Sequence, residues 1–455
     1  MEIRDELHEA LDGEQFSSPA LLARVMTRLD APPRARSQRW AALIAAVLTI
    51  AIVLTLVVVR ARLAGITPYR PAGATPTAAS GPTLPVSSSV IGETSYQFVS
   101  SEVGWLSVST GESNKQTVIA KTADGGQTWQ RQLSFSGPFS LSPPPMQFFS
   151  ANDGEVSGQD GGFPTVWRTA DGGATWQAHQ VSTSSASERF VSSSFVDAQH
   201  GWVLTSPANY APPSNSGPAL VYRTTDGANT WTQVGRLSAP NLVWLGISFA
   251  SASDGYITTS AGFANSQVWT APLPLFATHD GGATWTNFDL SAPPRGAFIE
   301  GLMTFTAGTG IMIVEASKVD ACPSQPGCFS MTLAGRYLYS TADGGHTWTG
   351  PRSIAHGYVD VIDPSRELLL NASGFATSTD GGKTWSASQA FAAPRGWFAT
   401  GAQFIDAQRG FITLSNTSEG NFPGAGAYGP SGKTALVYTS DGGSSWQPVP
   451  LSTGG

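Results

Sequence analysis

Charged residues and cysteine are scarce in this chain, and each scarcity excludes a class of protein. Only 13% of its 455 residues are charged, and residues 91–455 hold 16 Lys and Arg against 25 Asp and Glu, a net charge of −9. Nucleic-acid phosphates are bound by a basic face, so we expect no nucleic-acid partner. The two cysteines have no histidine nearby and cannot complete a tetrahedral zinc site.

Histidine is equally sparse. The six histidines are scattered, and no group of them has the spacing of a metal site. His279 and His346 fill variable positions of a repeated phrase, where we expect them to be exposed. We therefore predict no metal, no cofactor and no catalytic residue. Cys322 and Cys328 lie in Cys-Pro-Ser-Gln-Pro-Gly-Cys, and outside the membrane we expect them to form a local disulfide that shapes a loop.

Glycine and one repeated phrase dominate what remains. The chain has 50 Gly and 14 Trp, and it repeats Ser/Thr-x-Asp-Gly-Gly-x-Thr/Ser-Trp seven times. The repeats contribute Asp124, Asp171, Asp226, Asp280, Asp343, Asp380 and Asp441, and Trp129, Trp176, Trp231, Trp285, Trp348, Trp385 and Trp446. Their aspartates are 37 to 63 residues apart, a spacing typical of propeller blades or solenoid units.

Each phrase predicts a hairpin, because Asp-Gly between alternating apolar and polar residues suits a turn that requires positive φ. The carboxylate can accept hydrogen bonds from N–H groups of its own turn, and the preceding Ser or Thr can do similar work. We expect the Trp to pack on the neighbouring sheet. The third copy has Ala228 at the second glycine, which predicts a backbone there that is not strongly left-handed.

A second phrase precedes each hairpin: an aromatic residue, then glycine six positions later and usually another aromatic. Five copies are clean: Phe98/Gly104/Trp105, Phe148/Gly154, Phe195/Gly201/Trp202, Phe249/Gly255/Tyr256 and Phe404/Gly410/Phe411. The fifth unit is shortened (Phe305, Gly310) and the sixth is degenerate (Val361, Glu367, Leu368). Two hairpins per unit give four strands, the content of a propeller blade. We predict an all-β, seven-bladed β-propeller over residues 91–455.

The octads resemble the Asp-box, or bacterial neuraminidase repeat. Paired with Phe-x-Asp-x-x-x-Gly-Trp, they resemble the photosystem II assembly and stability factor family of seven-bladed propellers. That resemblance covers the region after about residue 91 and implies a client-holding role. The Asp box is shared by sialidases and sortilin-like receptors, so it is specific for the fold and not for the function.

The region before the propeller divides into three segments. Residues 1–40 predict a partly helical cytoplasmic tail, and residues 41–60 a transmembrane helix, because 41–59 are uncharged and span the ~30 Å hydrocarbon core. The flanking arginines are Arg24, Arg28, Arg34, Arg36 and Arg39 before it, and Arg60, Arg62 and Arg70 after it. This excess places the N-terminus in the cytoplasm and the propeller outside. Residues 61–90, rich in Pro, Ala, Thr and Ser, predict a tether.

Four long insertions fall in the second turn of their blades: Ser206–Ala219, Ser260–Phe276, Ser317–Gly335 and Asn416–Lys433. In a four-stranded meander these turns lie on the face opposite the Asp boxes. The insertions supply the candidate binding residues Tyr210, Trp269, Phe276, Phe329, Phe422 and Tyr428, aromatic anchors of the kind that bind protein or glycan. Local packing that covers the blade edges is the alternative.

The predicted function is a non-catalytic, membrane-anchored binding or assembly scaffold for a protein or cell-surface glycan. One alternative is a sialidase-type glycosidase, which needs an arginine cluster, a Tyr/Glu nucleophile pair and an acid Asp. The Arg-Ile-Pro element of that family is missing here, and the first blade has no arginine before Arg131. Another alternative is a transmembrane signalling regulator that uses the cytoplasmic tail.

Overall fold

The computed structural model describes part of the chain in enough detail for analysis. The described residues are 84, 86, 90–91, 93–110, 116–136, 144–182, 188–207, 218–238, 242–261, 275–288, 290, 297–299, 303–306, 308–321, 329–354, 358–363, 366–371, 374–380, 382–386, 389–416 and 433–451. Within these ranges no helix is long and apolar enough to cross a bilayer. The predicted cytoplasmic tail and transmembrane helix lie outside them.

The described residues form seven antiparallel sheets, which confirms the seven-bladed propeller. The first three blades are β2(Glu93–Phe98)–β3(Gly104–Thr110)–β4(Gln116–Thr122)–β5(Gln130–Ser136), β6(Met146–Phe148)–β7(Gly154–Asp160)–β8(Phe163–Thr169)–β9(Gln177–Gln180) and β10(Glu188–Phe195)–β11(Gly201–Pro207)–β12(Ala219–Thr224)–β13(Thr232–Leu237). Each is a meander of four strands in chain order.

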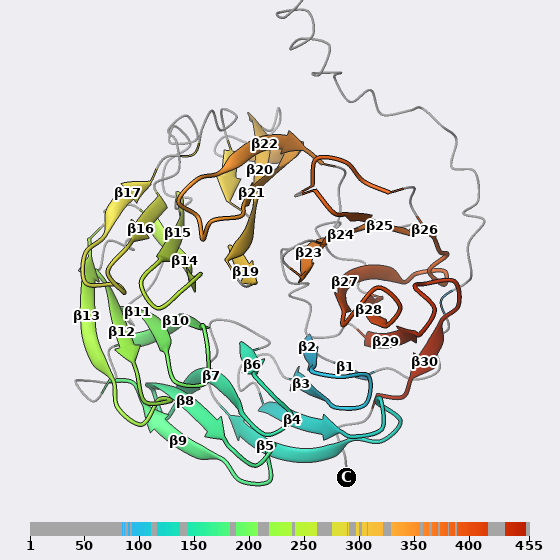
Figure 1. The fold of residues 1–455 in the computed structure, drawn as a ribbon, viewed down its shortest axis with the longest axis horizontal. Helices are drawn as coiled ribbons and strands as arrows, with labels where there is room; N and C mark the ends of the chain where they lie inside the picture. Colours follow the sequence, from blue (N-terminus) through green and yellow to red (C-terminus); the bar gives the residue numbers. More distant parts are fainter. Residues whose placement is uncertain are drawn as a thin grey trace, which may run out of the picture. The chain divides into compact units, whose positions relative to one another are not determined.

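The other four blades follow the same order with two additions. They are β14(Leu242–Phe249)–β15(Gly255–Ala261)–β16(Leu275–Thr278)–β17(Thr286–Phe288), β18(Ala297–Ile299) and β19(Thr304–Thr306) beside β20(Thr309–Ala321)–β21(Phe329–Thr341)–β22(Thr349–Ser353), β23(Tyr358–Asp363)–β24(Arg366–Asn371)–β25(Gly374–Ser378)–β26(Gln389–Ala390), and β27(Phe398–Phe404)–β28(Gly410–Ser415)–β29(Lys433–Thr439)–β30(Gln447–Val449). Blade five has a divided first strand, and blade seven gains β1(Val90–Ile91). The first strands lie nearest the centre of the ring and the last strands at its rim (Figure 1).

The second sequence phrase explains how the first two strands of a blade pack. Phe98 is the Cα partner of Gly104, and a Cβ on Gly104 would lie 2.5 Å from the Phe98 ring. Equivalent overlaps of 2.1 to 2.6 Å occur at Gly154, Gly201, Gly255, Gly310 and Gly410. The phenylalanine therefore lies flat across the glycine, and any side chain there would displace it.

That flat ring is the surface on which the preceding blade packs. Trp105 of blade one stacks on Phe148 of blade two, with ring centroids 3.5 Å apart. Trp202 stacks on Phe249 in the same way at 3.7 Å. The buried clusters accordingly span neighbouring blades. The core of this propeller is thus a series of interfaces between blades, and each interface includes residues from the two repeated phrases.

A glutamine before the phenylalanine adds polar links at three of these interfaces, a feature that sequence reasoning missed. The side chain of Gln97 accepts a hydrogen bond from the Phe148 N–H (2.7 Å) and donates to the Phe148 carbonyl (3.0 Å). Gln403 of blade seven bonds the backbone of Phe98 in the same two ways, at 2.9 and 3.2 Å. Gln147 donates to the carbonyl of Phe195 at 3.1 Å. The recurring Gln-Phe pair was the available signal.

Ring closure uses the same contacts as the other junctions. Phe411 of blade seven stacks on Phe98 of blade one at 3.7 Å, with an interplanar angle of 12°. The indole N–H of Trp129 donates to the Pro450 carbonyl at 2.8 Å. In addition, Val90 and Ile91 pair with Thr434 and Lys433 of β29. The ring therefore closes as an ordinary interface supplemented by one short strand from before blade one.

The propeller also begins earlier than the predicted boundary at residue 91. Leu84 is fully buried among residues of blades six and seven, and its N–H donates to the Ala392 carbonyl at 2.8 Å. Val86 packs against the same cluster. At least these two residues of the predicted linker 61–90 therefore belong to the folded domain. The burial of Leu84 and its backbone hydrogen bond hold the segment against blades six and seven.

We predict that Phe411→Ala lowers the free energy of unfolding by about 3–5 kcal/mol, because it removes a fully buried ring from the closing interface. Phe398→Ala in the same blade is the matched control. Phe398 is 48% exposed, so its loss should change stability by less than about 0.5 kcal/mol. Urea unfolding of both variants checks this. Equal effects would show that the closing stack does not contribute.

Candidate functional site

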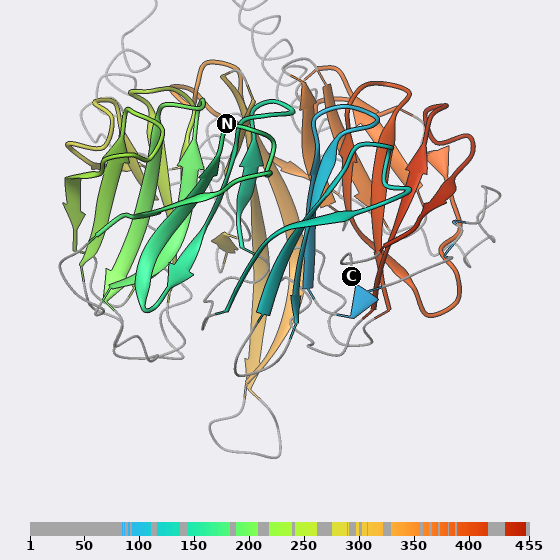
Figure 2. The same cartoon turned by 90° about the horizontal axis from the view of Figure 1, so that it is seen from below.

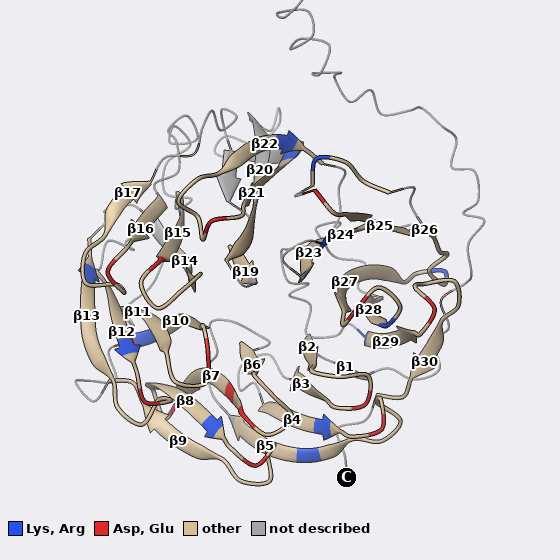
Figure 3. Cartoon of the chain, viewed as in Figure 1, with Lys and Arg blue, Asp and Glu red and all other residues tan. Residues whose placement is uncertain are grey.

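The propeller presents two faces, and hydrogen bonds identify them. In blades one to five and seven the box turn lies beside the turn between the first two strands: the Gly125 N–H donates to the Glu102 carbonyl at 2.9 Å, and that of Gly227 to Gln199 at 3.0 Å. We call this side the Asp-box face. The opposite side, where the second and third strands of each blade are joined, is the insertion face. Figure 3 shows most described acidic residues on connections between strands.

Each box is closed by its own side chains. In the first copy the buried Thr122 hydroxyl donates to Asp124 Oδ1 (2.8 Å) and accepts from the Gly126 N–H (2.8 Å). The N–H and hydroxyl of Thr128 donate to the two carboxylate oxygens at 2.9 and 2.6 Å. The same bonds recur in the other boxes, including those where Ser378 and Ser445 replace threonine. The predicted self-satisfied turn is confirmed.

These bonds keep the box carboxylates ionised. The hydroxyl and N–H of Thr128 lower the pKa of Asp124 to about 2, and the corresponding residues do the same for Asp171, Asp280, Asp343, Asp380 and Asp441. The pKa of Asp226 is lowered by the same bonds from Thr230. Because each carboxylate is already engaged within its turn, the boxes are structural elements of the Asp-box face.

The prediction about Ala228 is wrong. Its φ is +71°, close to the +70° of Gly227, and it lies in the left-handed region that L-residues rarely adopt. The Ala228 N–H donates to the Thr224 hydroxyl at 2.9 Å, the same bond that Gly126 makes in the first box. This bond requires the left-handed backbone whatever the side chain. The third box therefore retains its shape at the cost of strain.

We predict that Gly345→Ala destabilises the protein far more than Gly173→Ala. A Cβ on Gly345 would lie 2.1 Å from the Tyr256 hydroxyl, whereas one on Gly173 would lie 3.1 Å from Gln132 Oε1, the end of a flexible side chain. Both have φ above +90°, so the shared backbone penalty is about 1–2 kcal/mol and the clash adds about 1–3 kcal/mol at Gly345. Urea unfolding measures the difference, and equal losses would contradict the packing argument.

Two of the candidate binding residues lie in described strands. Phe276 is in β16, half-buried, with its ring centroid 5.8 Å from that of Trp244. It therefore belongs to the blade packing and not to a loop. Phe329 begins β21, opposite Ala321 of β20. Tyr210, Trp269, Phe422 and Tyr428 lie outside the described residues, as do Cys322 and Cys328, so the binding surface and the disulfide stay predictions.

The blade-five insertion, expected as a loop from Ser317 to Gly335, is largely a continuation of a β-hairpin. Ser317 pairs with Leu333, and the ladder continues to the Ala321–Phe329 pair. A register shift between Ala316 and Ser317 separates this extension from the body of the blade. Figure 2 shows the hairpin extending beyond the ends of the neighbouring strands. The insertion face thus carries at least one projecting element of regular structure.

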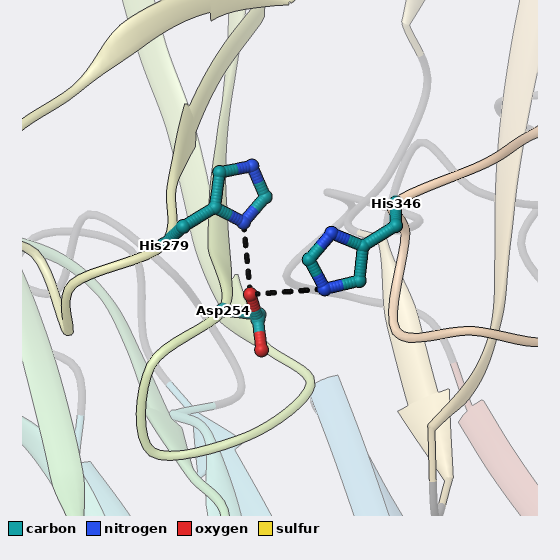
Figure 4. Close-up of side chains that lie close together, drawn as sticks. All are labelled: Asp254, His279 and His346. Atoms are coloured by element: carbon teal, nitrogen blue, oxygen red, sulfur yellow. Dashed lines mark hydrogen bonds and ion pairs between the residues drawn. The ribbon is translucent and has the colours of Figure 1, made fainter.

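On the Asp-box face, sequence reasoning missed one cluster. Asp254 lies in the first turn of blade four, and its Oδ1 atom accepts a hydrogen bond from His279 Nδ1 at 2.8 Å (Figure 4). The same oxygen lies 3.3 Å from His346 Nε2. The two histidines occupy boxes of adjacent blades, and they are exposed as predicted. Their proximity follows from the rotation between blades, which no single repeat encodes. The sequence indicates this cluster only when position two of one box is compared with position six of the next box, where His279 and His346 stand.

Buried carboxyl groups occur in blades two, three and six. Glu188 of blade three accepts hydrogen bonds from Tyr222 (3.0 Å), Thr205 (3.1 Å) and Ser182 (3.1 Å), and both Glu188 and Tyr222 are buried. In blade six Glu367 occupies the position of the glycine, opposite Ser378. Burial raises its pKa. The shorter Val361 in place of phenylalanine leaves room for this longer side chain.

Glu155 takes the interface position that Trp105 and Trp202 hold in the neighbouring blades. It is 2% exposed and accepts a hydrogen bond from the Ser157 hydroxyl. Burial raises its pKa to about 8, against the opposing effects of that hydrogen bond and of the Arg168 charge. A folded-state pKa above the ordinary 4.5 means that the folded protein keeps a proton that the unfolded chain releases. Its stability contribution is complete below about pH 4.5 and is lost as the pH rises through about 8.

We predict that Glu155→Gln removes this pH dependence. The wild type should lose more than about 1 kcal/mol of stability relative to the variant between pH 5 and pH 9, because the neutral amide never ionises. Urea unfolding of both proteins at the two pH values provides the comparison. A stability difference that does not change with pH would show that the Glu155 carboxyl is ionised throughout.

Comparisons with known proteins add the following. The BNR/Asp-box repeat model matches residues 376–387, and no curated protein matches the chain. Among solved structures, YCF48 from Cyanidioschyzon merolae is 18% identical, with 77% of this chain and 97% of that chain covered and a TM-score of 0.41. YCF48 bound to D1 peptide is 18% identical, with 74% and 96% covered and a TM-score of 0.40. The β-propeller domain of the Trilobed protease from Pyrococcus furiosus is 6% identical, with 80% and 99% covered and a TM-score of 0.44.

Proposed function

We propose that this protein is a non-catalytic binding or assembly scaffold that holds a protein or a cell-surface glycan on its insertion face. The observation that carries the proposal is the placement of the long connections. Residues 208–218, 262–274, 322–328 and 416–432 join second to third strands in blades three, four, five and seven. The corresponding connections in blades two and six are only residues 161–162 and 372–373. Long connections on one side of a rigid scaffold are where proteins place their binding residues.

The composition of these connections suits recognition. They include Tyr210, Trp269, Phe422 and Tyr428, and Trp and Tyr are enriched among the few residues that carry most of the binding energy in protein interfaces. The blade-five hairpin projects on the same side (Figure 2), so a partner could contact both its edge and its tip. The box carboxylates on the other face are already engaged within their own turns, which leaves the insertion face as the better candidate.

Membrane attachment is part of the proposal and rests on the sequence. The uncharged residues 41–59 suit a single span, and the arginine excess before them suits an N-terminus in the cytoplasm. The propeller would then lie outside the membrane, tethered by the residues between the span and Leu84. In that arrangement the scaffold would hold its partner close to the membrane surface.

The sialidase-type alternative has one feature in its favour, the hydrogen-bonded Tyr222–Glu188 pair, since such a pair serves as the nucleophile in that family. Both side chains are buried where blade three meets blade two, at 6% and 8% exposure. Glu188 also accepts hydrogen bonds from Thr205 of blade three and from Ser182, which follows the last strand of blade two. A pair enclosed in this way stabilises the blade and has no access to a sugar. We therefore expect the full-length protein to release nothing from a fluorogenic sialoside.

We predict that the blade-five hairpin tip is needed for partner capture. Replacing residues 322–328 with Asn-Gly closes the hairpin with a tight turn and removes the tip without disturbing the Ala321–Phe329 pair. Photo-crosslinking of the full-length protein at the cell surface should then recover less partner, while the melting temperature stays unchanged. Identification of the captured molecule decides between protein and glycan.

The matched control is the double variant Gln127→Ala, Lys383→Ala, which alters exposed box positions on the opposite face. It should capture the partner as the wild type does. If this variant lost capture and the shortened hairpin kept it, the partner would bind the Asp-box face and the proposal would be wrong.

A further inference from the structure

Three side chains with metal-binding atoms converge on the Asp-box face at the junction of blades four and five. Asp254 comes from the turn between β14 and β15, His279 from the β16–β17 box, and His346 from the β21–β22 box. The three ligand atoms, one carboxylate oxygen and two imidazole nitrogens, all lie within 4.8 Å of one another. The imidazole rings are nearly parallel, with centroids 4.8 Å apart. Figure 4 shows a nitrogen of each ring directed at the same oxygen.

We propose that Asp254, His279 and His346 bind a divalent transition-metal ion with the ligand preferences of zinc. Imidazole nitrogen at about 2.0–2.1 Å and carboxylate oxygen at about 2.0–2.2 Å are ordinary zinc ligands. Atoms around one such ion are roughly 3–4 Å apart, so small rotations of these half-exposed histidines complete the arrangement. Three protein ligands leave a fourth position open to water or to a donor from another molecule.

The carboxylate is oriented for this role by neighbours that do not contact the ion. Asp254 Oδ2 accepts hydrogen bonds from the hydroxyls of Ser251 (2.7 Å) and Ser253 (3.0 Å), which leaves Oδ1 directed at the histidines. Burial raises the pKa of Asp254, but the hydrogen bonds from His279, Ser251 and Ser253 outweigh it, so the net shift is downward and the group stays ionised. Such outer-shell bonds fix the geometry of metal ligands.

The two blades are held at a fixed spacing at this junction. The Tyr256 hydroxyl of blade four donates to the Gly344 carbonyl in the blade-five box at 3.0 Å. Its ring stacks on Phe305 with centroids 5.5 Å apart. His346 is two residues from Gly344, so its backbone is positioned relative to Asp254 by a partly buried contact. The site is therefore largely preorganised, as a metal site requires.

The repeat provides variants that leave the fold intact. Other boxes carry alanine at the positions of both histidines: Ala123, Ala170 and Ala342 at the second position, and Ala174 and Ala283 at the sixth. His279→Ala and His346→Ala therefore recreate residues that the turn already accepts. His200 is the matched control, because it bonds Asp197 at 2.9 Å on the same face and, among the described residues, belongs to no group of three such ligands.

The test is titration of the full-length protein, purified without a histidine tag, with Zn²⁺ by calorimetry and with Co²⁺ by visible absorption. The wild type should bind one ion at this site, more weakly as the pH falls, because protons compete for the imidazoles. His279→Ala, His346→Ala and Asp254→Asn should each weaken binding more than 100-fold. Ser251→Ala should weaken it about 10- to 100-fold, and His200→Ala should leave it unchanged.

Metal binding at these three residues does not depend on partner binding on the insertion face, so each can be lost without the other. If the double variant His279→Ala, His346→Ala bound Zn²⁺ with wild-type affinity, the ion would bind elsewhere and the proposal would be overturned. An undetectable interaction of Zn²⁺ with the wild type would overturn it equally. In that case the three residues form only a surface hydrogen-bonded cluster. Unchanged melting temperatures without metal would show that each variant is folded.

Discussion

The arrangement of this propeller depends on one contact, a phenylalanine ring lying flat across a glycine of the adjacent strand. The glycine is required because any Cβ would overlap the ring, and the flat ring is required because the preceding blade stacks on it. A single packing rule thus connects strands within a blade and connects each blade to the next. Blade six is the exception that fits this constraint. Val361 replaces the phenylalanine there, and its Cα partner is Glu367 in place of glycine.

Features determined within a few residues could be predicted from the sequence. The box closes through side chains no more than four positions apart, so its turn, its repetition and the count of seven blades were all available. The prediction for Ala228 was wrong because it considered the backbone preference of alanine alone and not the hydrogen bond from the Ala228 N–H to the Thr224 hydroxyl. Keeping that bond outweighs a left-handed penalty of about 1–2 kcal/mol.

Features that depend on the relation between blades could not be predicted. Leu84 lies in a stretch whose average composition indicates a tether, and only its packing against blades six and seven shows that this one side chain is buried. His279 and His346 belong to different repeats, and their proximity depends on how far one blade is rotated from the next. The extension of the blade-five hairpin was hidden because its ladder crosses a register shift at Ala316. In each case the missing information is three-dimensional.

The closing interface has a consequence for how the chain folds. The hydrogen bonds that join blade one to blade seven connect residues 305 to 321 positions apart, among the longest separations this chain can form. During synthesis, Leu84, Tyr96 and Phe98 leave the ribosome long before the strands that cover them exist. Contacts of such high sequence separation slow folding, and the aromatic surface of blade one stays accessible until blade seven arrives. Nascent chains therefore pass through an incomplete ring in which blade one exposes apolar surface. At this stage chaperone binding would protect the protein from aggregation.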